Sequence, residues 1–492
     1  MRSWKRRLRR IWGGLDMSFD ILDNLSIKLI DGDRGKNYPK QSDFFDKSDC
    51  LFLSAKNVTK TGFEFTDCSF ISKEKDQQLR AGKLERNDIV LTTRGTIGNS
   101  ALYDTSVSIN SVRINSGMII LRPDTNIWNP RFLYFLLNSD FVLQQISALT
   151  SGSAVPQLPA RDLRKFILPR VSLDKQHKIV EIIGSIVDKM RVSNAINQIL
   201  EQMTQALFKS WFVDFEPVKA KIMVLEAGGS QEDATLAAMT AISGKSADAL
   251  AIFEREHPEQ YAELKATAEL FPSAMQESKL GNIPDGWEMS TLAEKIKIIG
   301  GGTPKRSESD YWGGDICWYS VKDAPHDGDV FVIDTVEKIT AKGLNNSSTK
   351  LLPVGTTIIS ARGTVGKLAL VAVEMAMNQS CYGISGQDFS GPFLTYLRVK
   401  QCIDVLKRNT HGAVFDTITT NTFETVNIFT AHKTINDKFE EIVTPLFNSI
   451  KNNLVSNTYL SQLRDMLLPK LISGEIDLAD QTHIFNISTE GA

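Results

Sequence analysis

A five-residue motif that occurs twice constrains the fold of this chain more than any other feature. Arg94-Gly95-Thr96-Ile97-Gly98 returns as Arg362-Gly363-Thr364-Val365-Gly366. Each copy lies between two short apolar runs, so a strand, a glycine-containing turn and a second strand are predicted at both places. Glycine permits positive φ and close backbone approach, and arginine adds a planar group with five donors. The duplication predicts that larger parts of the chain are related.

A second set of matches extends the repeat into the helical parts at an offset of 260 residues (412 − 152 = 260), since Gly152 matches Gly412. Apolar positions of one long segment fall on apolar positions of the other. The matched sets are Ile179, Ile182, Ile183, Ile186, Met190, Leu200, Met203, Leu207 and Phe439, Ile442, Val443, Leu446, Ile450, Leu460, Leu463, Leu467. Two related halves are therefore predicted, each a β-rich module followed by a long helix.

Helical periodicity predicts the long helices over residues 174–211 and 432–471. Asp174 is expected to cap the first helix and Gly474 to end the second. The apolar residues step by four and three, as in a coiled coil. In the first helix this stripe is Ile179, Ile183, Ile186 and Met190, then, after a stutter at Ser193 and Asn194, Ile196, Leu200, Met203 and Leu207. The expected fold class is α+β: two β-rich domains separated by two long antiparallel helices in a coiled-coil-like pair, with a pseudo-two-fold internal repeat.

Changes in composition divide the chain into consecutive parts. The basic residues 1–17 are either an amphipathic arm for DNA or membrane or an upstream extension with Met17 as an alternative start. Residues 130–149 are predicted to form a buried helix with proline at its start. The expected parts are the extension (1–17), the first β-rich domain (18–172), a helical region (173–283) with a helical insertion for packing or partner docking (213–283), the second β-rich domain (284–431), a second helical region (432–476) and a tail (477–492).

Composition excludes several classes of protein. The 492 residues are 42% hydrophobic and 23% charged, which is typical of globular chains. The net charge of −2 requires any nucleic-acid binding to depend on local patches or on a partner. Five dispersed cysteines without a Cys-x-x-Cys motif indicate reduced thiols in a cytoplasmic protein and no zinc site. No apolar run approaches the roughly 18 residues of a membrane helix, so no membrane partner is expected.

The residues give no support for catalysis by this chain. Gly363-Thr364-Val365-Gly366-Lys367 lacks the glycine spacing of a phosphate loop, and Leu368 stands where a magnesium-binding hydroxyl is needed. Asn129-Pro130-Arg131-Phe132 has arginine where amino-methyltransferases have a second proline. No nucleophile, catalytic base or metal ligand set has a recognisable context. We therefore predict that the chain is not an enzyme.

With these motifs the chain resembles the specificity subunit of Type I restriction–modification systems over about residues 18–478. The motifs are Ile283-Pro284-Asp285-Gly286-Trp287, Gly301-Gly302-Thr303-Pro304, Tyr311-Trp312-Gly313-Gly314-Asp315-Ile316, both Arg-Gly-Thr-x-Gly turns, and the helix ends Leu200-Glu201-Gln202-Met203 and Leu460-Ser461-Gln462-Leu463. The first module departs from the pattern, because it lacks the Pro-x-Gly-Trp and Gly-Gly-Thr-Pro motifs and has a cationic loop at residues 34–40 instead.

The resemblance implies a DNA-binding subunit with two target-recognition domains, each reading half of a split double-stranded sequence, and a helical ruler between them. Two methyltransferase subunits would grip the helices, and motor–nuclease subunits would join for restriction. S-adenosylmethionine, ATP and magnesium would bind these partners, so this chain needs no cofactor for DNA methylation or cleavage. The alternative is a helical scaffold or binding protein with duplicated β modules and no DNA role.

The candidate DNA-binding residues are cations, hydroxyls, amides and glycines in the loops of both modules. The loop at residues 34–40 has a composition suited to phosphate contact and base stacking, although a solvated turn has the same composition. Arg94 and Arg362 could equally brace their own turns. The candidates are Arg34, Lys36, Asn37, Tyr38, Lys40, Arg94, Thr96, Ser151, Gly152, Gly301, Thr303, Lys305, Ser320, Lys322, Arg362, Thr364, Lys367, Asn378, Gln379, His411 and Gly412.

Overall fold

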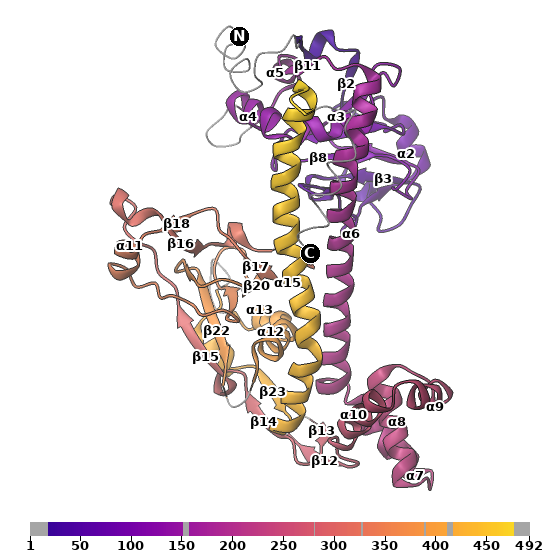
Figure 1. The fold of residues 1–492 in the computed structure, drawn as a ribbon, viewed down its shortest axis with the longest axis vertical. Coiled ribbons are helices and arrows are strands. Elements are labelled where there is room, and N and C mark those ends of the chain that lie inside the picture. The colour runs from indigo at the N-terminus through magenta and orange to yellow at the C-terminus, as the bar shows by residue number, and fades with distance from the viewer. Residues whose placement is uncertain are drawn as a thin grey trace. The chain divides into compact units, whose positions relative to one another are not determined.

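The computed structural model describes residues 18–150, 157–279, 281–325, 328–387, 390–410 and 417–476 (Figure 1). The chain forms two compact units, one of residues 1–191 with 458–492 and the other of residues 192–457. The expected N-terminal extension and the tail lie outside the described residues. The domain boundaries stay predictions, because this division cuts through both long helices.

The first unit contains the first β-rich module. Its strands are β1 (Phe19–Ile21), β2 (Ile27–Asp31), β3 (Cys50–Leu53), β4 (Val58–Thr59), β5 (Gly62–Phe63), β6 (Phe70–Ile71), β7 (Asp88–Thr92), β8 (Ser100–Tyr103), β9 (Val112–Ile114), β10 (Met118–Pro123) and β11 (Ile167–Pro169). The main sheet is antiparallel, in the order β2-β10-β7-β8. A second sheet has the order β6-β3-β9, and β1–β11 and β4–β5 form pairs. Every residue of β7 is buried, as its apolar run predicts.

Short helices cover this module: α2 (Lys73–Gln78), α3 (Pro130–Leu137), α4 (Asp140–Leu149) and α5 (Ala160–Leu163). The predicted single helix over residues 130–149 is wrong, because it breaks into α3 and α4 at Asn138 and Ser139. Both residues favour helix ends, since their short polar side chains compete for backbone groups. Pro130 does begin α3, and the Asn129 side chain accepts a hydrogen bond from the Arg131 amide at 2.9 Å.

The second unit contains the second β-rich module, with the same order of elements. Its strands are β14 (Glu288–Thr291), β15 (Ile296–Gly300), β16 (Trp312–Tyr319), β17 (Phe331–Val332), β18 (Lys338–Ile339), β19 (Thr357–Ser360), β20 (Leu368–Val371), β21 (Met375–Met377), β22 (Cys381–Gly386) and β23 (Asn427–Thr430). The sheets β15-β22-β19-β20-β17, β18-β16-β21 and β14-β23 correspond to those of the first module. The helices are α11 (Ala341–Asn345), α12 (Pro392–Gln401), α13 (Ile403–Arg408) and α14 (Thr420–Glu424).

The two predicted long helices are confirmed as α6 (Leu173–Phe212) and α15 (Lys433–Ser473). In the first unit, the beginning of α6 packs with the end of α15, since Ile179 and Leu468 share one core. In the second unit, the end of α6 packs with the beginning of α15, where the Phe212 and Phe439 rings lie 5.0 Å apart. The helices are therefore antiparallel in both units, as predicted.

The ends of the long helices differ in one detail from the prediction. Asp174 is not the cap of α6, because the helix already begins at Leu173 and Asp174 lies in its first turn. Gly474 follows α15 with φ of 81°, a left-handed conformation that ends a helix at little cost for glycine. The predicted stop signal is therefore confirmed.

Beyond the stutter, the predicted inward stripe of α6 is wrong at two of its four residues. Leu200 and Leu207 pack against the core of the second unit, as predicted. Ile196 and Met203 are 43% and 47% exposed, whereas Asn197 and Thr204 are fully buried. Asn197 accepts a hydrogen bond from Asn453 of α15 at 2.8 Å. A polar layer thus lies in the helix pair of the second unit, and Ile196 and Met203 face outward.

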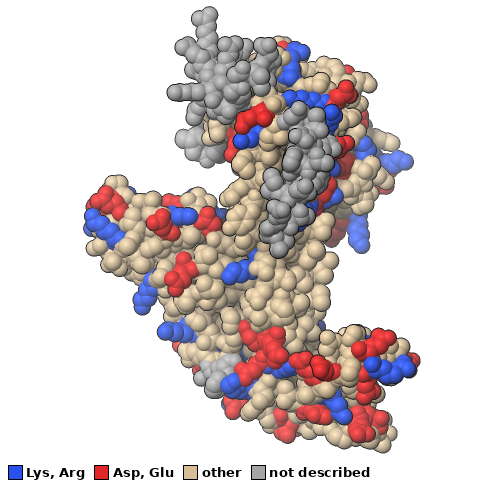
Figure 2. Space-filling view, in the orientation of Figure 1, with Lys and Arg blue, Asp and Glu red and all other residues tan. Residues whose placement is uncertain are grey.

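Residues 213–283 form the helices α7 (Glu216–Glu226), α8 (Gln231–Ser243), α9 (Ala247–Glu256) and α10 (Pro258–Glu269), followed by the hairpin of β12 (Met275–Ser278) and β13 (Gly281–Pro284). Acidic side chains gather over α8–α10 on the visible face (Figure 2). Trp211 at the end of α6 packs edge-to-face on Phe271, with ring centroids 4.9 Å apart. Among the described residues no single helix has the length and apolar composition to cross a membrane, while α8 and α9 pass that test only as a pair bent by 87°.

Candidate nucleic-acid interface

The Arg-Gly-Thr-x-Gly turn has the same geometry in both modules, where it joins β7 to β8 and β19 to β20. The second glycine donates its amide to the strand behind it, from Gly98 to the Thr92 carbonyl at 3.0 Å and from Gly366 to the Ser360 carbonyl at 2.9 Å. The hydroxyls of Thr92 and Ser360 donate to the carbonyls inside the turn. Positive φ is required at both glycines: Gly95 (74°), Gly98 (94°), Gly363 (76°) and Gly366 (84°).

This geometry presents the arginine side chains outward. Arg94 and Arg362 are both exposed, and neither forms an ion pair with another residue in the described part of the chain. Thr96, Thr364 and Lys367 in the same turns are exposed as well. The turns are held by backbone and hydroxyl groups, so the guanidinium groups are not needed to brace them.

In the second module the loop after β15 meets the loop after β21. A Cβ atom on Gly301 would overlap the carbonyl of Asn378, so only glycine permits this approach. The Thr303 hydroxyl donates to the side-chain oxygen of Gln379. The Asn378 amide donates to the Tyr319 carbonyl at 2.9 Å, which connects both loops to the end of β16. The candidate pair Gly301 and Thr303 therefore lies beside the candidate pair Asn378 and Gln379, which is distant in sequence.

Two further loops join this group. The Ser320 hydroxyl and amide both bond the Asp323 carboxylate at 2.8 Å, so the exposed Lys322 sits on a fixed turn. The Ala361 amide donates to the Ser380 carbonyl at 2.8 Å and joins the Arg362 turn to the group. Three of these four loops therefore present the exposed cations Lys305, Lys322, Arg362 and Lys367.

The first module has the same arrangement, although its sequence motif is different. A Cβ atom on Gly32 would overlap the carbonyl of Asn115, as at Gly301 and Asn378. Arg34 donates to the Ser116 carbonyl at 3.3 Å, and the Arg94 amide donates to Gly117 at 3.2 Å. Gly32 thus takes the place of the apparently missing Gly-Gly-Thr-Pro turn.

Sequence reasoning missed several residues of the first module. Ser54 and Asn57 form the same bonded turn as Ser320 and Asp323, with the Ser54 hydroxyl 3.0 Å from Asn57. This turn carries the exposed Lys56, which pairs with Asp67 at 2.9 Å. The signal was a second repeated motif, Ser-x-Lys-Asn at residue 54 and Ser-x-Lys-Asp at residue 320. Asn115 and Ser116 occupy the places of Asn378 and Gln379.

The remaining candidates of the first loop have mixed surroundings. Lys36 and Lys40 are exposed, and the Asn37 amide donates to the Gln78 carbonyl at 3.1 Å. The half-buried Tyr38 ring packs edge-to-face on Phe52 with centroids 5.7 Å apart. The predicted stacking of Tyr38 on a base stays a prediction, but its ring already belongs to the core of this loop.

Four candidates, Ser151, Gly152, His411 and Gly412, lie outside the described residues. The residues that follow them return to the two Arg-Gly-Thr turns. Leu158 donates to the Thr93 carbonyl and Ile418 to the Ala361 carbonyl, both at 3.0 Å. The chain therefore enters the same loop group in both modules.

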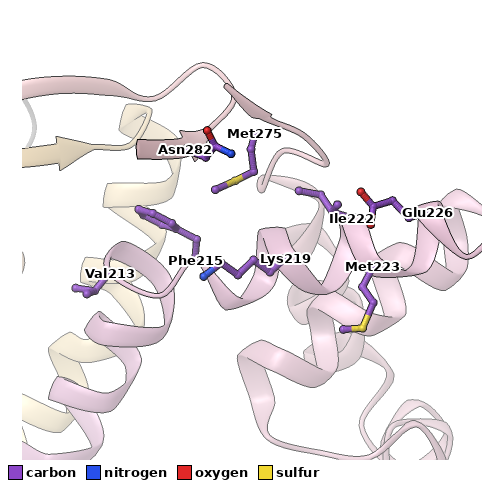
Figure 3. Close-up of a pocket in the computed structure, with 8 residues that line it drawn as sticks. All are labelled: Val213, Phe215, Lys219, Ile222, Met223, Glu226, Met275 and Asn282. Atoms are coloured by element: carbon purple, nitrogen blue, oxygen red, sulfur yellow. The ribbon is translucent and has the colours of Figure 1, made fainter. Parts of the chain in front are cut away.

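The described residues hold no group of three or more potential metal-binding side chains. Burial raises the pKa of the Cys381 thiol to about 12 and that of Cys402 to about 11, so both remain protonated near neutral pH. A groove of the second unit lies between α7 and the β12–β13 hairpin (Figure 3), and its lining includes Phe215, Lys219 and Met275. It contains none of the candidate DNA-binding residues.

Comparison with known proteins places these duplicated modules in a family. The model of the Type I restriction modification DNA specificity domain matches the chain twice, over residues 29–202 and 284–457. The chain belongs to this family. It is 32% identical over 455 residues to the Type I restriction enzyme HindI specificity subunit of Haemophilus influenzae, covering 90% of this chain and 98% of that protein.

More distant family members match over similar lengths. The MjaIX specificity subunit of Methanocaldococcus jannaschii is 23% identical over 395 residues, covering 80% of this chain and 78% of its own. The solved S subunit from M. genitalium is 13% identical and covers 93% of this chain and 96% of its own, with a TM-score of 0.42. The two specificity domains of the family correspond to the two β-rich modules with their adjoining helices.

Replacement of Arg362 by alanine is expected to weaken DNA binding about ten-fold, because a charge-assisted hydrogen bond to phosphate contributes about 1.5 kcal/mol. The melting temperature should change by no more than about two degrees, since the turn holds itself without this side chain. Fluorescence anisotropy with DNA and thermal melting measure both effects. Arg255→Ala on α9 is the control for loss of an exposed charge. A large fall in melting temperature with unchanged DNA binding would assign Arg362 a bracing role.

Proposed function

We propose that this chain is the subunit that reads a split double-stranded DNA sequence for a Type I restriction–modification complex. The observation that carries the proposal is the duplicated loop group, which presents exposed cations from equivalent turns in both modules. Phosphate contacts from such cations position a protein on DNA, and amides and hydroxyls beside them read base edges. One module per half-site accounts for a duplicated site on a single chain.

The charge of the chain fits a division of labour within a complex. A net charge of −2 gives little general attraction to DNA, so the local cations need support from other subunits. We place S-adenosylmethionine on methyltransferase subunits, and ATP and magnesium on motor–nuclease subunits, in the cytoplasm. A gel-shift assay tests the proposal, with DNA that carries the methylation site and the chain bound to its methyltransferase. Absence of any DNA-dependent shift would favour the scaffold alternative.

Apolar residues on the outward faces of the long helices favour the binding of two identical partner subunits. In the second unit Ile199 and Met203 are 56% and 47% exposed, and in the first unit their repeat equivalents Tyr459 and Leu463 are 67% and 37% exposed. Apolar side chains at equivalent, exposed positions indicate a binding surface. We propose that one methyltransferase subunit docks on each surface.

Glutamate at Met203 is expected to release one methyltransferase subunit, because an unpaired charge buried in an interface costs about 3 kcal/mol or more, at least about a hundred-fold in affinity. Native mass spectrometry should show one methyltransferase on Met203→Glu instead of two. Gln202→Glu places the same charge on the neighbouring position and is the control. If the Met203→Glu chain still binds two methyltransferase subunits, this apolar surface is not a docking site.

A further inference from the structure

Two tryptophans hold the reading loop of the second module in place. The indole N–H of Trp318 donates to the Gly302 carbonyl at 3.0 Å, and that of Trp312 donates to the Lys305 carbonyl at 3.2 Å. The two rings pack edge-to-face, with centroids 5.1 Å apart. Trp318 is only 2% exposed, so the loop rests on an immobile support. Thr303, which lies between the two bonded carbonyls, is thereby fixed in position.

Arg306 completes this support instead of serving as a free cation. Its guanidinium carbon lies 3.8 Å from the centroid of the Trp312 ring, within the range of a cation–π interaction. Both terminal nitrogens of Arg306 bond the Glu337 carboxylate, the second at 3.1 Å. A guanidinium group that stacks on a ring and also forms two hydrogen bonds to one carboxylate is restricted to few rotamers. The end of the loop is therefore held by an ion pair that stacks on Trp312.

The first module holds the corresponding loop with different chemistry. Asp33 is 8% exposed and accepts hydrogen bonds from the Gly35 amide at 2.7 Å and the Arg80 amide at 2.6 Å. The bond from Gly35 is the largest cause that lowers the pKa of Asp33, so the carboxylate is ionised near neutral pH. A buried carboxylate thus has the role that two indoles and an ion pair have in the second module.

We infer that these supports maintain base discrimination, each for its own half-site: Trp312, Trp318, Arg306 and Glu337 for the second and Asp33 for the first. They are positioning residues, since they act through the loops that carry Thr303, Lys305 and Arg34. A recognition group held loosely accepts several bases, because its hydrogen bonds no longer require one geometry. The inference rests on the proposed function and adds residues that lie behind the DNA-facing loops.

The test uses Trp312→Phe and Asp33→Asn in the complete methyltransferase complex, with methylation mapped by sequencing. Phenylalanine keeps an aromatic ring beneath Arg306 but removes the N–H donor together with the five-membered ring of the indole. We expect Trp312→Phe to relax bases in the second half-site, with discrimination lowered about five-fold, the value of one neutral hydrogen bond. Asp33→Asn should relax the first half-site only. The other half-site and the spacer are internal controls in each variant.

Glu337→Gln is the second variant of the same support, because its exposed side chain can change without a cavity in the core. It should relax the second half-site as Trp312→Phe does. Unchanged specificity in both variants, or equal relaxation of both half-sites in any variant, would overturn the inference. Failure of the proposed function would be seen separately, in exchange of whole modules between wild-type subunits.

Discussion

Four residues added to each long helix should lengthen the unread spacer of the DNA target by one or two base pairs and leave both half-sites unchanged. Four residues add about 6 Å to a helix at ~1.5 Å per residue, and a base pair occupies ~3.4 Å. Four residues are also nearly one helical turn, so the facing side of each helix is kept. The measurement is the methylation motif of the variant complex.

The structure decides where these residues should be inserted. A single insertion after Leu207 would displace Phe208 and Phe212, which pack on Phe439 with centroids 6.1 and 5.0 Å apart. Insertions after Arg191 and after Asn457 instead leave the interior of each unit intact, because they fall where the two units divide. Both helices must be extended, since residues of α6 and α15 share a core in each unit.

The control is insertion of the same four residues between Gly228 and Gly229, where α7 joins α8 on the surface. This variant adds equal length to the chain but none to α6 or α15. Its spacer should be that of the wild type. If the helix-extended complex methylates DNA with an unchanged spacer, the helices do not set the distance and the partner subunits must.

The repeat could be predicted from sequence because both of its signals are local. A buried strand needs a continuous apolar run, and the turn between β7 and β8 needs glycine at positions of positive φ, so each leaves a mark in a few residues. The same apolar run and glycines around residue 362 predicted the second copy. Both long helices could be predicted as well, since their apolar periodicity extends over about eight turns.

The face of a helix that packs inward was harder to predict than the helix itself. Ile196 and Met203 have the spacing of a buried stripe, yet they are exposed, and Asn197 and Thr204 are buried in their place. Periodicity shows that a helix has an apolar side but not which surface meets it. An apolar stripe that binds another subunit has the same sequence pattern as one that packs on the chain's own second helix.

The first reading loop was incompletely predicted for a different reason. Gly32 and Lys36 match Gly301 and Lys305 of the second module, but the rest of the loop differs. The requirement for glycine at position 32 comes from the backbone of Asn115, which is distant in sequence. Tyr38 has the composition of a stacking residue, but the position of Phe52 beneath it could not be known before folding. Contacts between loops depend on tertiary structure and leave weak signals in one sequence.

Replacement of residues 284–430 by the equivalent module of another subunit of this family is expected to change one half of the recognised sequence completely. The structure defines what the donor must supply. Trp287 packs on Phe215 with centroids 5.4 Å apart, so an aromatic residue is needed there. Glu440 of α15 accepts the Phe393 and Leu394 amides at 3.0 and 2.9 Å and thereby caps α12.

A donor with glycine at position 391 keeps this contact, because a Cβ atom there would overlap the Glu440 carboxylate and displace it. Burial raises the pKa of the Glu440 carboxyl, and the hydrogen bonds from the Phe393 and Leu394 amides oppose this shift. A chimera that respects these contacts should melt within a few degrees of the wild type. A chimera that also carries Gly391→Ala is the matched control for a module that is present but packs incorrectly on α15. Its complex should no longer methylate DNA.

Sequencing of methylated bases in cells that express this chimera with its methyltransferase tests the central claim most directly. We expect the half-site read by residues 18–170 and the length of the spacer to remain those of the wild type, and the other half-site to become that of the donor. A motif changed in both halves, or in neither, would contradict the assignment of one β-rich module to each half of the DNA target.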